Sequence, residues 1–254
     1  MPKKANRTSF SCAVIPDTQV RAGHSVDHLR AAGNYIADHR PEVIVHLGDH
    51  WDMHSLSVYD KGKMAAEGAD YSEDINAGNV ALDALMRPIE KKRGYNPKKI
   101  FLIGNHEERI LRHIEANPIL RNTLGYKDFN LKTHGFSVVP FLVPIVIGGV
   151  TFAHYFYNPN TGKPYCGHAD NMLTRIGFSF TQGHQQGKKI AERSLGNGAT
   201  QRALVIGSYY PHDEQYRGPQ ANSHWRGFVM KHEMGGGDYC LLELSLKYMM
   251  QTWA

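Results

Sequence analysis

Short apolar runs in the first half of the chain alternate with amphipathic stretches. Each run ends in polar residues, and together they predict three buried strands, at 11–17 (SCAVIPD), 43–49 (VIVHLGD) and 99–107 (KIFLIGNHE). The stretches between and after them predict helices at 25–40 (with Ser25 as N-cap), 72–93 and 107–115. Strands that alternate with helices favour an α/β fold with parallel strands.

The second half has a different pattern, because most of its apolar runs are short and separated by turn residues. They predict strands at 136–147, 150–153, 177–181, 203–208, 227–232 and 239–246. The uncharged stretch from Val138 to Val150 contains Pro140, Pro144 and a Gly148-Gly149 pair, which exclude a membrane helix and indicate two strands around a hairpin turn. We therefore expect a second sheet packed on the first, with helices outside both.

The composition is that of a globular protein with one domain. The chain has 254 residues, of which 41% are hydrophobic and 21% charged, which is typical of a globular protein. No repeat or linker divides it, so we predict one domain over 1–254 with a flexible tail at 1–8. The three cysteines lack metal-site or disulfide spacing and no secretory leader is evident, which predicts a soluble protein of the cytoplasm. A net charge of +5 permits an anionic partner.

Polar residues that can bind a metal ion follow five of the predicted strands. They are Asp17, Asp49, Asn105 with His106, His154 and His184. Loops at the carboxyl ends of neighbouring strands meet on one side of an α/β sheet, so these side chains are expected to converge. Any one of them could be only a turn former or a helix cap. As a set, oxygen ligands with some imidazole favour Mn, Mg, Zn or Fe ions.

The motifs that contain these residues occur in a fixed order. They are DTQ at 17–19, GDHWD at 48–52, GNHE at 104–107, His154 and GHQQ at 183–186. In this order the chain resembles the calcineurin-like metallophosphoesterase family, and the segment at 207–227 is similar to a bacteriophage and prophage branch of it. The resemblance implies a four-layer αββα architecture, a two-sheet β-sandwich flanked by helices, and hydrolysis of phosphate esters at a pair of divalent metal ions.

The resemblance also implies two sets of metal ligands. Site one would comprise Asp17, Gln19, Asp49 and Gln186, and site two would comprise Asp49, Asn105, His154 and His184. Gln19 and Gln186 stand where the family has histidines, so site one has only oxygen donors, which favours hard ions. Mn²⁺ is the expected metal, with Mg²⁺, Zn²⁺ and Fe as alternatives, and a decayed site is a further alternative.

Two assignments within the motifs have rivals. His134 competes with His154 for the fourth motif, but only His154 directly follows a predicted strand. In the family, the histidine of GNH stabilises the transition state and protonates the leaving oxygen, which implies that His106 is catalytic. Asp52 is expected to accept a hydrogen bond from His106, the alternative being a loop carboxylate that faces water. Glu107 is expected at the N-terminus of a helix, beside its dipole.

Candidate substrate residues lie outside the motifs. They are His54 in the long 53–97 connection, and His212, His224, Trp225 and Arg226, which could stack on a base and contact phosphate. A surface loop with a core tryptophan is the alternative interpretation. We predict a phosphodiesterase that acts on nucleic acid or nucleotides, without a membrane partner and in the host cytoplasm if phage-encoded. A phosphomonoesterase (including a protein phosphatase) and a nonenzymatic nucleic-acid-binding protein are the alternatives, and the oligomeric state is left open.

Overall fold

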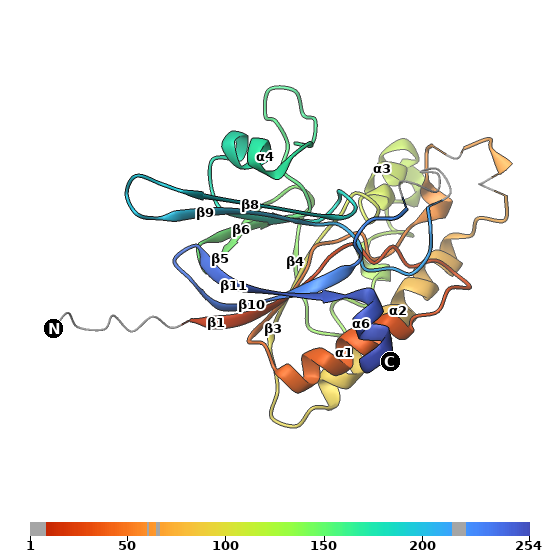
Figure 1. Cartoon of the computed structure of the whole chain (residues 1–254). Coiled ribbons are helices and arrows are strands. Elements are labelled where there is room, and N and C mark those ends of the chain that lie inside the picture. The colour runs from red at the N-terminus through yellow and green to blue at the C-terminus, as the bar shows by residue number, and fades with distance from the viewer. Residues whose placement is uncertain (1–8, 60, 65–66, 215–221) are drawn as a thin grey trace.

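The computed structural model describes residues 9–59, 61–64, 67–214 and 222–254, so the predicted tail at 1–8 lies outside it. Two mixed β-sheets lie face to face, and helices cover their outer faces (Figure 1). The predicted α/β sandwich is therefore the observed fold class. No helix in the described ranges has the length and apolar character needed to cross a membrane.

The first sheet has six strands in the order β11-β10-β1-β2-β3-β4. Strands β1 (Phe10–Ile15), β2 (Val43–His46), β3 (Lys98–Leu102) and β4 (Ser137–Val139) are parallel, whereas β10 (Gly227–Gly235) and β11 (Asp238–Ser245) complete the sheet as antiparallel strands. Helices α1 (Asp27–His39), α2 (Tyr71–Lys91) and α6 (Leu246–Thr252) cover its outer face, and α3 (Arg109–Ala116) follows β3.

The second sheet has five strands in the order β5-β6-β7-β9-β8. Its central strands β6 (Val150–Ala153), β7 (Phe180–Gln182) and β9 (Thr200–Ile206) are parallel, and the edge strands β5 (Ile145–Ile147) and β8 (Lys188–Ser194) are antiparallel to their neighbours. Helix α4 (Ala169–Ile176) packs on the outer face. Single-turn 3-10 helices η1 (His54–Leu56), η3 (Pro118–Leu120) and η4 (Tyr126–Asp128) lie in the connections.

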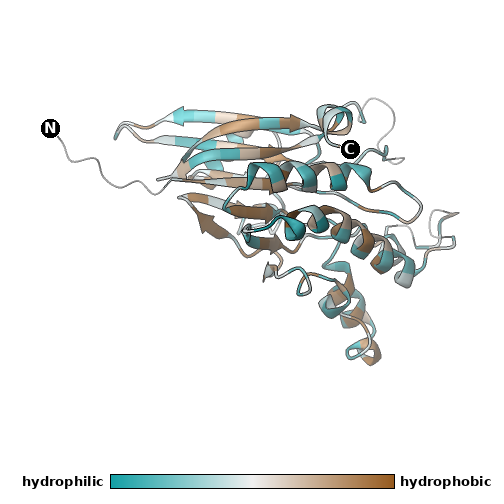
Figure 2. Ribbon diagram, turned by 90° about the horizontal axis from the view of Figure 1, so that it is seen from below, coloured by the Kyte–Doolittle hydropathy of each residue, from teal (hydrophilic) through white to brown (hydrophobic). Residues whose placement is uncertain are grey.

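Side chains of β1 alternate between two cores. Cys12 and Val14 belong to the core between the sheets, whereas Ala13 and Ile15 belong to the core under α1 and α2. This period of two is what a strand buried on both faces requires, and it explains why β1 reads as a continuous apolar run. Figure 2 shows that some strands are mostly hydrophobic, whereas other strands and the helices carry alternating hydrophobic and hydrophilic stretches.

One lysine is buried between the sheets. Lys231 of β10 is fully buried, donates a hydrogen bond to Thr181 Oγ1 and lies with Nζ 3.9 Å from the centre of the Tyr239 ring. Burial lowers the pKa of Lys231 to about 7, because the charged ammonium is poorly solvated there.

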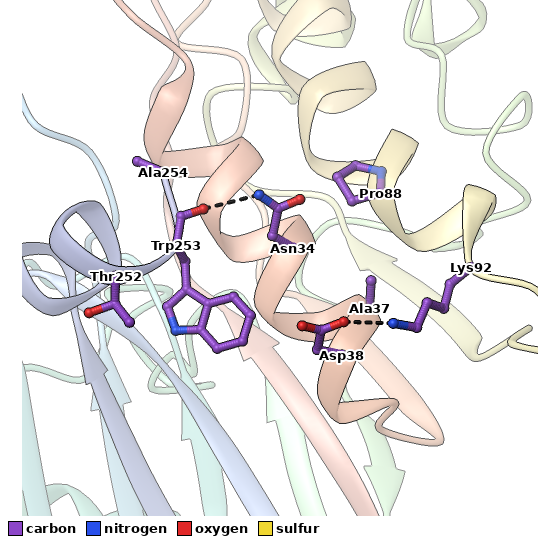
Figure 3. A pocket seen from close by; sticks show the side chains of 8 residues that line it. All are labelled: Asn34, Ala37, Asp38, Pro88, Lys92, Thr252, Trp253 and Ala254. Atoms are coloured by element: carbon purple, nitrogen blue, oxygen red, sulfur yellow. Dashed lines mark hydrogen bonds and ion pairs between the residues drawn. The ribbon is translucent and has the colours of Figure 1, made fainter.

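The C-terminus packs beside α1 and α2 and forms the edge of a pocket of about 470 Å³. Asn34 Nδ2 donates to the Trp253 carbonyl at 3.0 Å, and Lys92 pairs with Asp38 at 2.6 Å (Figure 3). The first contact joins the C-terminal end of the chain to α1, and the second joins the end of α2 to α1. The pocket contains none of the candidate metal ligands.

Several predicted boundaries differ from the observed ones. The predicted strand at 136–147 is two strands in different sheets, and the chain crosses between the sheets over Pro140–Pro144, where the prolines cannot donate ladder hydrogen bonds. The Gly148-Gly149 hairpin between β5 and β6 is as predicted. Helix α4 and strand β8 were not predicted. Helix α1 begins at Asp27, and Ser25 Oγ accepts a hydrogen bond from the Asp27 amide instead of capping the helix.

Candidate metal centre and active site

Loops at the carboxyl ends of five strands carry the candidate ligands. Asp17 and Gln19 follow β1, Asp49 follows β2, Asn105 follows β3, His154 follows β6, and His184 with Gln186 follows β7. The first sheet supplies the four acidic and amide residues that follow β1 to β3, and the second sheet supplies the histidines. Asp17, Gln19, Asp49 and His154 are buried, and the others are partly buried. The two facing sheets therefore bring the ligands together.

Four of these residues form a close cluster. One ligand atom from each of Asp49, His154 and His184 lies within 4.8 Å of the other two. His154 Nε2 is 3.3 Å from Asp49 Oδ2 and 3.0 Å from Asn105 Oδ1. The other ring nitrogen, Nδ1, is 2.7 Å from the Leu47 carbonyl and donates to it, so that the lone pair of the neutral ring lies on Nε2, facing the cluster. These are the residues expected at site two.

Two oxygens beside this cluster lack partners. Asp17 Oδ1 accepts a hydrogen bond from the His184 amide at 3.0 Å, but Asp17 Oδ2 and Gln19 Oε1 are buried and have no hydrogen-bond partner among the described residues. A buried, unsatisfied oxygen is costly, and a cation would satisfy both of them. The donor set therefore fits divalent metal ions. Gln186 is partly buried on the same loop as His184.

Burial and neighbouring charges shift the pKa values of the cluster in opposite directions. Burial raises the pKa of Asp17 well above its usual range. Burial alone would lower the pKa of His154, but the charge of Asp49 raises it to about 9, and the pKa of Asp49 is lowered, against its burial, by the charges of His106 and His154. Burial lowers the pKa of His184 to about 4. Asp49 is thus the central negative charge of the cluster.

Three candidate ligands have a strained backbone. Gln19, Asp49 and His184 have φ values of 34°, 49° and 63°, in the left-handed region that non-glycine residues rarely adopt. Such residues cost of order 1–3 kcal/mol each and persist only where surrounding contacts hold them, most often at functional sites. The contacts that hold Asp49 and Gln19 are therefore part of the site.

Glu107 holds the loop of Asp49. Its carboxylate is fully buried and accepts four backbone hydrogen bonds: from the amides of Asp49 (2.9 Å), His50 (2.6 Å), Trp51 (3.1 Å) and Gly104 (2.9 Å). Burial, with the charge of Asp49, raises its pKa to about 7. Glu107 was expected at a helix N-terminus, but α3 begins only at Arg109, and the carboxylate instead joins the loops after β2 and β3.

A second buried chain of hydrogen bonds joins the loops after β1 and β2. The amides of Thr18 and Gln19 donate to the Asp49 carbonyl at 3.1 and 2.9 Å. His50 Nε2 donates to the Gly78 carbonyl at 2.9 Å, so its Nδ1 accepts from Thr18 Oγ1 at 2.7 Å. Burial lowers the pKa of His50 to about 4, which keeps the ring neutral for this role. Thr18 and His50 were not predicted, because their contacts join two loops that are far apart in the sequence.

Two motif glycines are needed because ligand carboxylates press against them. A Cβ atom on Gly104 would lie 2.2 Å from Asp49 Oδ1, and one on Gly183 would lie 2.4 Å from Asp17 Oδ1. Both distances are far below van der Waals contact. The glycines before Asn105 and His184 therefore make room for the carboxylates that come from neighbouring strands.

His106 lies against both Asp52 and the metal-ligand cluster. Its Nδ1 is 2.9 Å from Asp52 Oδ1 and 2.7 Å from the Asp52 carbonyl, so this nitrogen carries the proton. Its Nε2 is 3.8 Å from Asp49 Oδ2. Burial would lower the pKa of His106, but the carboxylates of Asp49 and Asp52 raise it. Arg109 Nη1 donates to the Asp52 carbonyl at 2.7 Å, with Nη2 3.4 Å from His106 Nε2.

Residues 10–241 match the family model of the calcineurin-like phosphoesterases. The chain belongs to this family. Its relatives include the Gene 54 proteins of Mycobacterium phages L5 and D29, which are 25% identical over 197 residues and 24% identical over 196 residues, in each case 75% of this chain and 74% of the phage protein. The predicted family and the likeness to a phage branch are thus confirmed.

A dimetal phosphatase from Danio rerio is similar in structure, with a TM-score of 0.41 and 12% sequence identity over 94% of this chain and 96% of that one. Family membership makes the chain a metal-dependent phosphoesterase and implies a dinuclear site of divalent ions. The identity of the metal and the ligand sets remain proposals.

Other predicted residues of this phosphoesterase lie elsewhere. His134 is held between Asp83 and Glu90 of α2, 2.8 Å from a carboxylate oxygen of each, and so does not compete with His154 for the cluster. His54 begins η1 and is partly buried.

The late segment of the phosphoesterase, of which residues 207–214 and 222–227 are described, holds Trp225 and Arg226 in contacts within the protein. Trp225 packs against the core between the sheets, and Lys188 Nζ lies 5.0 Å from its ring centre. Arg226 donates to the Pro211 carbonyl at 2.9 Å and pairs with Asp213 at 2.5 Å. The roles of Trp225 in base stacking and of Arg226 in phosphate binding stay predictions beside these internal contacts.

The other two histidines predicted to bind substrate, His212 and His224, lie beside Tyr210. The His212 ring stacks on the Tyr210 ring with centres 4.5 Å apart, and the His224 ring is 6.4 Å from it. Residues 215–221 of this segment lie outside the described ranges.

Two aromatic residues that were not predicted, Tyr155 and Phe141, lie beside the ligand cluster of the phosphoesterase. The ring centre of Tyr155 is 4.5 Å from that of His184, and the Phe141 ring is 5.7 Å from Tyr155. The Arg112 guanidinium lies 5.7 Å from the Phe141 ring centre. The position of Tyr155 directly after His154 was the available signal, whereas Phe141 and Arg112 come from distant segments.

Proposed function

We propose that this phosphoesterase hydrolyses phosphodiester bonds in nucleic acids or nucleotides and that Mn²⁺ is its expected metal. The observation that carries the proposal is the convergence of ligand atoms from both sheets, with two buried oxygens, Asp17 Oδ2 and Gln19 Oε1, that lack hydrogen-bond partners in the described chain. A cation in the site would satisfy these oxygens.

The proposed ligand sets are those that the family resemblance implies. Asp17, Gln19, Asp49 and Gln186 would hold one ion, and Asp49, Asn105, His154 and His184 the other. When bound, two such ions polarise the phosphate oxygens and make water nucleophilic at neutral pH. Site one has oxygen donors only, which favours Mn²⁺ or Mg²⁺ over softer ions.

His106 is the proposed general acid. Its Nδ1 proton is bound by Asp52, which fixes the orientation of the ring and leaves Nε2 facing the cluster. A protonated Nε2 in this position can donate its proton to the leaving oxygen. The raised pKa of His106 supports this role, because more of the ring carries the second proton near neutral pH.

Basic and aromatic groups beside the cluster support a nucleotide or nucleic acid as substrate. Arg109 lies beside His106, and Arg112 lies over Phe141, next to Tyr155. Arginine binds phosphate oxygens, and aromatic rings stack on bases. The net charge of +5 favours an anionic polymer. These residues add to Trp225 and Arg226, which stay among the proposed substrate contacts.

The test is a panel of substrates assayed with and without added Mn²⁺: a dinucleotide, a single-stranded oligonucleotide, a 4-nitrophenyl diester and the matching monoesters. Metal-dependent cleavage of the diesters supports the proposal, with Asp49→Ala as the inactive control. Cleavage of monoesters alone would favour a phosphatase, and binding of the oligonucleotide without cleavage would favour a nonenzymatic role. The predictions of a single domain and of a location in the host cytoplasm remain predictions.

A further inference from the structure

A continuous chain of charged contacts leads from His106 to the late segment of the protein. Asp52 binds His106 through Oδ1 at 2.9 Å and accepts a hydrogen bond from Arg21 Nε through Oδ2 at 2.6 Å. Arg21 Nη2 in turn donates to Glu214 Oε2 at 2.7 Å, and His212 Nε2 lies 3.5 Å from Glu214 Oε1. Arg21 and Glu214 are 193 positions apart in the sequence.

The carboxylate of Glu214 is buried, with 2% of its side chain exposed. A buried carboxylate is strongly unfavourable unless a positive charge and hydrogen bonds compensate it. The backbone at this position is also fixed, because the Glu214 amide donates to Asn222 Oδ1 and Asn222 Nδ2 donates to the Glu214 carbonyl, both at 2.9 Å. The late segment thus places one negative charge against Arg21 and holds it there.

The same guanidinium serves both carboxylates. Arg21 uses its Nε for Asp52 and its Nη2 for Glu214, and the planar fork fixes the two bonds relative to each other. The side chain of Asp52 is also buried, at 4% exposed, whereas that of Arg21 is 29% exposed. Without Glu214, Arg21 would keep, among the described residues, only the Asp52 contact and could turn toward solvent. Asp52 would then lose the partner that fixes its Oδ2.

We propose that Glu214 and Arg21 are positioning residues, which hold Asp52 and through it aim the proton of His106 at the leaving oxygen. This inference rests on the proposed general-acid role of His106. It gives the late segment a function in the reaction that does not require Trp225 or Arg226 to touch substrate. Glu214 is buried behind Arg21 and acts only through it and Asp52.

A comparison of leaving groups distinguishes this role from a structural one. A 4-nitrophenolate leaves without protonation, whereas the alkoxide of a nucleoside needs a proton from the acid. Glu214→Gln keeps the size of the side chain but removes its charge. We expect it to lower kcat on a dinucleotide about 10-fold or more, since small misplacements of a catalytic group cost up to about 10² in rate. On the 4-nitrophenyl ester of a nucleotide, kcat should fall less than about 2-fold by the same reasoning, because the step needs no acid.

Two further variants sharpen the comparison. In a His106→Ala background, Glu214→Gln should have no additional effect on dinucleotide cleavage, because the group that it positions is absent. Asp213→Asn is the matched control: it breaks the neighbouring Arg226 ion pair, and the side chain of Asp213 is 71% exposed. We expect it to leave the ratio of the two rates unchanged.

Each outcome decides for or against the proposal. Equal losses on both substrates would mean that Glu214 supports the fold or the metal centre, and no loss would mean that the contact is inert; either result overturns the inference. If thermal melting shows that the Glu214→Gln protein is not folded, Arg21→Lys serves as the second test variant. Lysine keeps the positive charge but cannot bond to both carboxylates through a fixed fork. Failure of the wild-type protein to cleave any phosphoester would instead refute the proposed function.

Discussion

Replacing Glu107 by glutamine should loosen the loop that carries Asp49. Each carboxylate oxygen of Glu107 accepts two backbone hydrogen bonds: Oε1 from His50 and Trp51, and Oε2 from Asp49 and Gly104. A glutamine keeps one oxygen, while its amide group faces two backbone donors that it cannot accept from. Two bonds to a charged acceptor, each contributing about 1.5–3 kcal/mol, are lost, so the free energy of unfolding should fall by about 3–6 kcal/mol. This is a large part of the 5–15 kcal/mol typical of a folded protein.

Urea unfolding at pH 8 measures this loss, because the carboxylate of Glu107, whose pKa is about 7, is then charged. Metal affinity should fall too, since the contacts of Glu107 help to hold Asp49 at its φ of 49°. The matched control is Glu108→Gln on the adjacent residue, whose carboxylate accepts one hydrogen bond, from Tyr126 Oη. A Glu107→Gln protein within about 1 kcal/mol of wild type, or no less stable than the Glu108→Gln protein, would refute the reasoning, because a lost bond to a charged group costs more.

Four other results are expected. His106→Ala should lower kcat by about 10²–10⁴ while metal content, measured by elemental analysis, stays normal; a collapse of metal content would make His106 a ligand. Replacing Gln19 and Gln186 together by histidine should raise metal affinity in titrations and shift preference toward Zn²⁺, and unchanged titrations would remove both from site one. Burial lowers the pKa of Lys231 to about 7, below that of the unfolded chain, so the unfolded state binds more protons above pH 7. Wild-type stability should therefore rise from pH 7 to about 8.5 relative to Lys231→Met, approaching about 1.4 kcal/mol per pH unit, and parallel stability curves would contradict this. Trp225→Ala should lower the melting temperature but leave oligonucleotide affinity unchanged, because its ring packs against the core; a selective loss of affinity would support its predicted role in stacking.

The elements that the sequence predicted best are the buried strands with local signals. Strands β1, β2 and β3 are short apolar runs that end in a ligand, so pattern and motif coincide there. The strand predicted over 136–147 was wrong because hydrophobicity alone does not reveal which sheet a strand joins. Helix α4 was missed although its buried Ala169, Met172 and Leu173 have a helical spacing, because it is only 8 residues long, and β8 was missed because its residues are mostly polar.

Only the residues of the site that lie within the sequence motifs could be predicted. The candidate ligands follow from short, ordered patterns, but the groups that hold them depend on tertiary contacts. Glu107 binds amides 56–58 positions earlier in the chain, and Arg21 meets Glu214 from the other end of the sequence. No local spacing encodes such pairs, because they form only when loops from different strands meet at one edge of the fold.

The close contact between glycines and ligand carboxylates has a consequence for how this gene tolerates change. At Gly104 and Gly183 even alanine, the smallest substitution, would collide with the carboxylate of Asp49 or Asp17. The two glycines have no chemical role of their own, yet a scan of all single substitutions should score them as intolerant as the ligands beside them. The positions at which a single substitution inactivates the protein therefore outnumber the metal ligands. A survey of inactive alleles should identify the glycines that make room for the ligands as well as the ligands themselves.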